Sequence, residues 1–118
     1  MLLVANILVA LVALFHVGFL VLEMFLWDHP VGRKRFGLTP EYSKASATLA
    51  ANQGLYNGFL AAGLLWGLSL GEAGNSIKLF FLGCVVVAGV LGALTASRKI
   101  LWVQGFPGAV AMALVAAS

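Results

Sequence analysis

Charged residues are scarce in this chain. Only 9% of its 118 residues are Asp, Glu, Lys or Arg, whereas soluble domains carry about a quarter. Hydrophobic residues make up 62%, and the mean hydropathy is +1.03. This balance argues against an ordinary soluble domain, and the length fits one domain. The composition therefore predicts a single integral membrane domain over residues 1–118.

Cysteine and other metal ligands are also few. The single Cys84 excludes an intramolecular disulfide. His16 and Glu23 do not fill a tetrahedral shell, His29 falls in a loop, and Cys84 lies at another depth of the membrane. We therefore predict no metal site. An axial haem ligand at His16 would lack a second ligand at matching depth, so the sequence names no cofactor.

What the chain has in abundance is long apolar runs, and four of them approach membrane-crossing length. They cover about residues 2–27, 48–70, 77–97 and 102–117, with a polar loop at 28–47. Pro30 and Gly32 should interrupt the helix in that loop. Thr39-Pro40-Glu41 then predicts a new helix, with Thr39 as N-cap, that continues to Leu70.

Basic residues orient these spans. The first and third loops hold all but one of them, at Arg33, Lys34, Arg35, Lys44, Arg98 and Lys99, while Lys78 lies on the other side. The positive-inside rule then makes both loops cytoplasmic and turns both termini outward. We predict an all-α bundle of four transmembrane helices in the cytoplasmic (inner) membrane. Arg33, Lys34 and Arg35 are expected to contact anionic headgroups of the bilayer rather than nucleic acid.

Polar residues interrupt the apolar spans at one depth. The second span opens with Asn52, Gln53, Tyr56 and Asn57. In the predicted topology they lie level with Glu23 of the first span and Gln104 of the fourth, while His16 shares a helical face with Glu23, seven residues earlier. Intramembrane ionisable groups are candidate functional residues. These side chains predict a polar cavity in the cytoplasmic half of the bundle.

Three functions are compatible with these polar residues. The residues could bind or move a small amphipathic molecule, which is the reading we favour. Alternatively, Glu23 could act as general acid or base of a membrane enzyme on a lipophilic substrate, with His16 or Tyr56 as its proton partner. In the third reading the polar groups only join helices, and Gly63, Gly67 and Gly71 drive homo-oligomerisation without a ligand.

Several motifs together resemble a known family. They are Leu22-Glu-Met-Phe-Leu-Trp27, Phe36-Gly-Leu-Thr-Pro-Glu41, Ala51-Asn-Gln-Gly-Leu-Tyr-Asn-Gly-Phe59 and Gln104-Gly-Phe-Pro107. The chain resembles, over nearly its whole length, the small bacterial membrane proteins catalogued as domain of unknown function 1304. The resemblance implies a four-span inner-membrane protein with no assigned activity. It marks as motif positions Glu23, Trp27, Asn52, Gln53, Tyr56, Asn57, Gln104 and Pro107.

Overall fold

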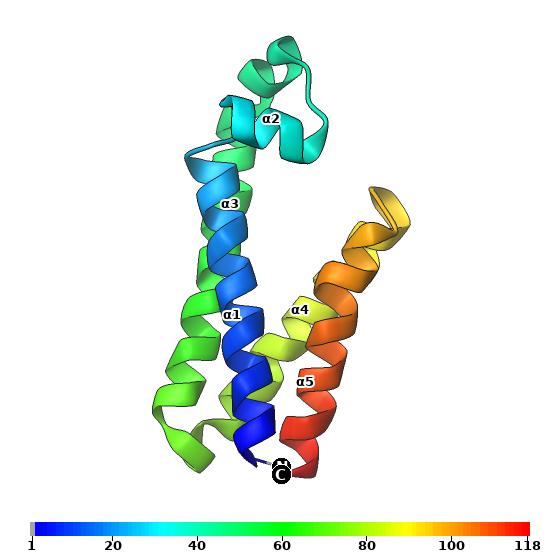
Figure 1. Ribbon diagram of the computed structural model, residues 1–118. Helices are drawn as coiled ribbons and strands as arrows, with labels where there is room; N and C mark the ends of the chain where they lie inside the picture. Colours follow the sequence, from blue (N-terminus) through cyan, green and yellow to red (C-terminus); the bar gives the residue numbers. More distant parts are fainter. Residues whose placement is uncertain (1) are drawn as a thin grey trace. The chain divides into compact units, whose positions relative to one another are not determined.

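The computed structural model describes residues 2–118, which are mostly helical and contain no strand (Figure 1). The helices are α1 (Leu2–Met24), α2 (Pro30–Phe36), α3 (Pro40–Ser69), α4 (Asn75–Thr95) and α5 (Phe106–Ala117). A 3-10 turn occupies Gly71–Gly74, and a π-helical turn occupies Leu101–Gly105. The predicted all-α class is confirmed. Leu2–Met24 and Gly71–Thr95 are long and apolar enough to cross a membrane, and Leu101–Ala117 is a shorter apolar helix.

The chain forms two compact units. One consists of Phe15–Phe59, and the other of residues 2–14 together with Leu60–Ser118. Both α1 and α3 therefore contribute one segment to each unit.

The larger unit has an apolar core supplied by four helices. Its fully buried side chains are Ala5, Val9, Val12 and Ala13 of α1, Leu64 of α3, Leu82 and Val85 of α4, and Ala111 and Val115 of α5. The α1 positions recur at intervals of three and four residues, which places them on one helical face. Small and β-branched side chains dominate this core, as close packing between apolar helices requires.

Glycine allows α3 and α4 to join through a very short connection. A Cβ on Gly74 would lie 1.9 Å from the carbonyl oxygen of Gly67, so the two backbones are in direct contact. Gly71 has a φ of 62°, the left-handed conformation that commonly ends a helix. A short turn separates the second and third predicted spans, but α4 begins at Asn75, two residues before the expected start at residue 77.

A π-helical turn precedes α5. The N–H of Phe106 bonds to the oxygen of Leu101, five residues back. Pro107 explains this spacing, because it has no N–H and its ring would crowd the carbonyl of Val103 in a regular α-helix. The turn packs closely on α4, since a Cβ on Gly89 would lie 2.5 Å from the Cα of Gly105.

In the smaller unit, the polar loop folds into a helix that the sequence analysis did not expect. Pro30 does not break a helix there but begins α2, where the Nδ1 of His29 accepts from the N–H of Val31 at 3.2 Å. Gly32 does not break the helix either but lies inside α2. Glycine is needed at this position, because a Cβ there would lie 1.8 Å from the carbonyl oxygen of Leu26. The local sequence did not indicate α2, because a helix of seven residues is too short to be stable alone and depends on tertiary contacts.

The predicted start of the next helix is confirmed. The N–H of Tyr42 donates to the Oγ1 of Thr39 at 3.2 Å, and α3 begins at Pro40. It continues to Ser69, one residue short of the expected end at Leu70. The side-chain cap and the preset φ of proline are local signals, which is why the sequence alone could place this boundary.

Candidate functional site

A hydrogen bond between Glu23 and Asn57 forms the centre of the candidate site. Glu23 lies in the last turn of α1 and Asn57 in the middle of α3, 34 residues later. The Nδ2 of Asn57 donates to the Oε1 of Glu23, and both side chains are half-buried. The depth argument from the sequence expected these two residues at one level, and the structure brings them into contact.

Two glycines make that contact possible. A Cβ on Gly54 would lie 2.6 Å from the Cγ of Met24 and 3.2 Å from the oxygen of Leu20. One turn later, a Cβ on Gly58 would lie 2.7 Å from the Cδ1 of Leu20. Small residues four positions apart let helix backbones approach closely. Gly54 and Gly58 therefore hold α3 against α1 just where Glu23 reaches Asn57.

The other polar residues of α3 surround this pair on the helix surface. Gln53 precedes Asn57 by one turn, and Asn52 precedes Tyr56 in the same way, so the four form two adjacent rows. Asn52, Gln53 and Tyr56 are all exposed, the last by 57%. The Tyr56 ring is tilted against that of Phe59, with centroids 6.0 Å apart. We call Glu23, Asn52, Gln53, Tyr56 and Asn57 the polar face.

His16 and Trp27 lie on either side of Glu23 along the chain. His16 is 1% exposed, and its ring meets Phe19 edge-on at 5.5 Å between centroids. It lies roughly 10 Å from Glu23 along the axis of α1. The indole N–H of Trp27 donates to the Oγ of Ser46 at 3.0 Å. Trp27, just after the end of α1, is thus tied to α3, and its indole N–H is already used by Ser46.

Gln104 belongs to the other unit. It lies half-buried within the π-helical turn Leu101–Gly105. Its predicted convergence with the polar face stays a prediction. π-helical turns inside α-helices occur frequently at functional sites, so its position in this turn gives Gln104 a second reason for interest.

Two polar contacts were missed by the sequence analysis. In one, the Oδ1 of Asp28 accepts from the Oγ of Ser43 at 2.7 Å and from the Nη1 of Arg33 at 2.9 Å. The Ser43 hydrogen bond, assisted by Arg33, lowers the pKa of Asp28. In the other, the Nζ of Lys78 donates to the Oδ1 of Asn6 at 2.9 Å, and Lys78 is fully buried.

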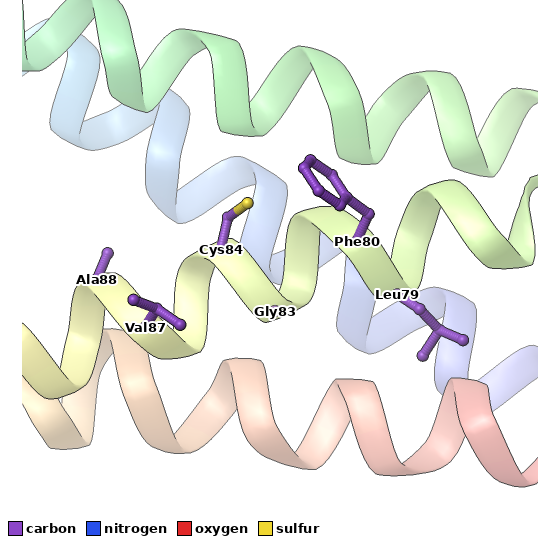
Figure 2. Close-up of a pocket in the computed structure, with 6 residues that line it drawn as sticks. All are labelled: Leu79, Phe80, Gly83, Cys84, Val87 and Ala88. Atoms are coloured by element: carbon purple, nitrogen blue, oxygen red, sulfur yellow. The ribbon is translucent and has the colours of Figure 1, made fainter.

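The described residues 2–118 contain no metal-binding cluster, and the pocket that they do show is apolar. Among residues 2–118, no three His, Cys, Asp or Glu side chains lie close enough to hold a metal ion. A shallow apolar depression of about 580 Å³ lies along α4. Figure 2 shows Phe80 and Cys84 pointing to the same side of the helix there, with Leu79 pointing away from them. No residue of the polar face lines it.

Comparison with known proteins identifies the family. Residues 10–116 match the family described as Protein of unknown function (DUF1304). The uncharacterized protein YpaA of Lactococcus lactis subsp. lactis (strain IL1403) is 31% identical over 97 residues, which cover 80% of this chain and 82% of that protein. No solved structure matches the chain. As its motifs suggested, the chain belongs to the DUF1304 family, a bacterial family of unknown function.

Proposed function

We propose that this protein spans the cytoplasmic membrane four times and uses the polar face to bind or move a small amphipathic molecule. One observation carries the proposal. The Glu23 carboxyl lies within an apolar helix long enough to cross a bilayer, and an amide of α3 bonds to it. A carboxyl group at such a position is expensive to keep, which favours a functional role.

The polar face offers suitable contacts for a small head group. A carboxylate has about four lone-pair positions, and Asn57 occupies one, so Glu23 can accept a further hydrogen bond. The exposed amides of Asn52 and Gln53 add both donors and acceptors. A head group carrying N–H or O–H donors fits this set best.

Apolar surface adjoins these groups. Leu55 is 41% exposed and Phe59 is 55% exposed, and both lie on α3 within one turn of the polar residues. A hydrocarbon tail could lie against them while the head group engages Glu23. This pairing of apolar and polar surface supports an amphipathic ligand over a fully polar one.

The four-span topology rests on α3 and α5 as well as on the two segments, Leu2–Met24 and Gly71–Thr95, that are both long and apolar enough to cross a membrane. From Leu49 to Ser69, α3 carries no charged residue, and its thirty residues exceed the length needed to cross. The segment Leu101–Ala117 is uncharged and apolar. The cluster of basic residues at the first and third loops supports a cytoplasmic location for those loops.

Exposed amides also favour a second candidate function, self-association. Asn52 and Gln53 at membrane depth would be stabilised by hydrogen bonds to another copy of the chain. The glycine row at Gly63, Gly67 and Gly71 is less suitable as a dimer surface. A Cβ on Gly63 would lie 2.4 Å from the ring of Phe81, and Gly67 packs on Lys78, so these two glycines already pack within the chain, whereas Gly71 has no atom within 4 Å of such a Cβ.

Mass spectrometry of the detergent-solubilised protein tests the proposed ligand. We expect a discrete stoichiometric molecule with the wild type and its loss from Glu23→Gln, which removes the acceptor charge but keeps the shape. Glu72→Gln is the matched control, because Glu72 is an exposed carboxyl in the turn Gly71–Gly74. Only bulk lipid in all three samples would refute ligand binding and leave self-association.

The same experiment addresses the enzyme alternative. A general acid or base can be lost without losing substrate. If Glu23→Gln retains the molecule that the wild type converts, Glu23 is a catalytic group rather than a binding group. Loss of the molecule from Glu23→Gln supports binding.

A further inference from the structure

Side-chain hydrogen bonds hold together the connection between α1 and α3, which we call the elbow: Trp27, Asp28, α2 and the first two turns of α3. Asp28 joins Arg33 of α2 to Ser43 of α3 through its two hydrogen bonds. Ser43 is fully buried. Because both contacts are charge-assisted and one partner is buried, α2 has a fixed place beside α3 (Figure 1).

The two faces of α2 differ sharply. Gly32 and Phe36, four positions apart, form the inner face: Gly32 is buried, and the Phe36 ring packs on Trp27 with centroids 5.0 Å apart. Val31, Lys34 and Arg35 share the outer face, at helical spacings of three and four. All three are exposed. The outer face therefore combines two cations with an apolar residue.

A series of contacts orients Arg35. Its guanidinium carbon lies 5.7 Å from the centre of the Phe36 ring, a cation–π distance. Phe36 packs on Trp27, whose indole N–H bonds to Ser46 of α3. The rings of Phe36 and Trp27 thus connect the Arg35 guanidinium to Ser46 of α3 and orient it. Arg33, by contrast, is already paired with Asp28.

From this geometry we infer that the outer face of α2 binds the phosphate of an anionic phospholipid at the membrane surface. Arg35 presents a planar fork that matches two phosphate oxygens, and Lys34 adds a point charge. Val31, 52% exposed, can enter the interfacial region beside them. The inference rests on the membrane location proposed above but not on a ligand at Glu23.

A lipid fits this face better than a nucleic acid or an acidic peptide does. The elbow begins three residues after the end of α1, a helix long enough to span a bilayer, so the headgroup layer is within reach. Basic residues just outside a span are attracted to anionic lipids. The exposed Val31 between the two cations suits the headgroup boundary, where polar and apolar surface meet.

Native mass spectrometry of the full-length protein in mixed micelles measures this binding. We expect phosphatidylglycerol to bind more tightly than phosphatidylcholine. Lys34→Gln/Arg35→Gln should weaken phosphatidylglycerol binding about 30-fold, since each basic residue near an anionic surface contributes roughly fivefold. Arg35→Lys should also weaken it several-fold, because lysine keeps the charge but cannot present the fork.

The control removes the same two charges elsewhere. Arg98→Gln/Lys99→Gln alters exposed residues of the other unit and should cause a clearly smaller loss. Equal losses of phosphatidylglycerol affinity in the two double variants would mean that only the net charge of the protein matters, and would overturn the inference. So would wild-type affinity in Arg35→Lys, or equal binding of the two lipids. Competition by free glycerol phosphate at the same concentration as the lipid would show a soluble phosphate site instead.

These outcomes are independent of the ligand experiment. Glu23→Gln should leave phosphatidylglycerol binding at α2 unchanged, because Glu23 contacts neither Lys34 nor Arg35. Loss of the co-purifying molecule with intact lipid binding would separate the two sites. All the α2 substitutions are at exposed positions, so elution profile and helical circular dichroism should match those of the wild type.

Discussion

The bond between Lys78 and Asn6 allows the sharpest test of what stabilises the larger unit. It joins α4 to α1 across 72 residues of sequence, with an Nζ–Oδ1 distance of 2.9 Å. Lys78 is 0% exposed, and no Asp or Glu of residues 2–118 lies within ion-pair distance of it. The amide oxygen of Asn6 is thus the polar partner of a fully buried amine.

Removing one partner should cost far more than removing both. Asn6→Leu leaves a buried ammonium without its acceptor, for which a loss of about 3–5 kcal/mol is expected. Lys78→Met keeps an unbranched side chain one atom shorter but leaves the Asn6 amide unpaired, which should cost about 1–3 kcal/mol. The double variant replaces the pair by apolar groups of similar size and should be near neutral. The sum of the single losses therefore exceeds the loss in the double variant by several kcal/mol.

Unfolding of the four proteins in one detergent, followed by circular dichroism, measures this cycle. Polar pairs between transmembrane helices average only about 0.6 kcal/mol. A loss of that size in Asn6→Leu would refute the reasoning above and show that Lys78 is not buried as a charge. An additive double variant would refute the pairing itself.

Two further predictions concern the backbone contacts and the elbow. Gly74→Ala should destabilise the protein by more than about 2 kcal/mol, because its Cβ would lie 1.9 Å from the Gly67 oxygen. Gly83→Ala is the control and should be tolerated, because the nearest atom to its Cβ would be 3.9 Å away. Thermal unfolding of the two variants and the wild type measures the difference. The pKa of Asp28 is lowered in the folded protein, so its contribution to stability is present above the ordinary value of 3.8 and is lost as the pH falls through the folded pKa. Ser43→Ala removes the hydrogen bond that contributes most to the low pKa of Asp28, so the loss of stability in acid should move to higher pH. Hydrogen exchange of α2, measured as the pH is lowered, would detect this shift. An unchanged acid transition would contradict the role assigned to Ser43.

Local signals in the sequence predicted local structure well and tertiary structure poorly. The start of α3 followed from Thr39 and Pro40, because a side-chain cap and a preset φ act within four residues. The helix α2 did not follow, because Gly32 is required there by the backbone of Leu26, which is visible only in three dimensions. The π-helical turn before Pro107 likewise depends on how the chain relieves a clash.

The depth of a polar residue in the predicted topology relates one helix to another, and it bears on two pairs in this chain. It places Glu23 and Asn57 at one level, and they bond. In the same topology Asn6 starts the first span and Lys78 starts the third, both at the outer level, so this pair was equally predictable. Buried polar groups in apolar helices find partners because leaving them unpaired costs more than ordering them. By the same reasoning, the exposed amides of Asn52 and Gln53 mark the surface where this protein is expected to meet a molecule from outside its own chain.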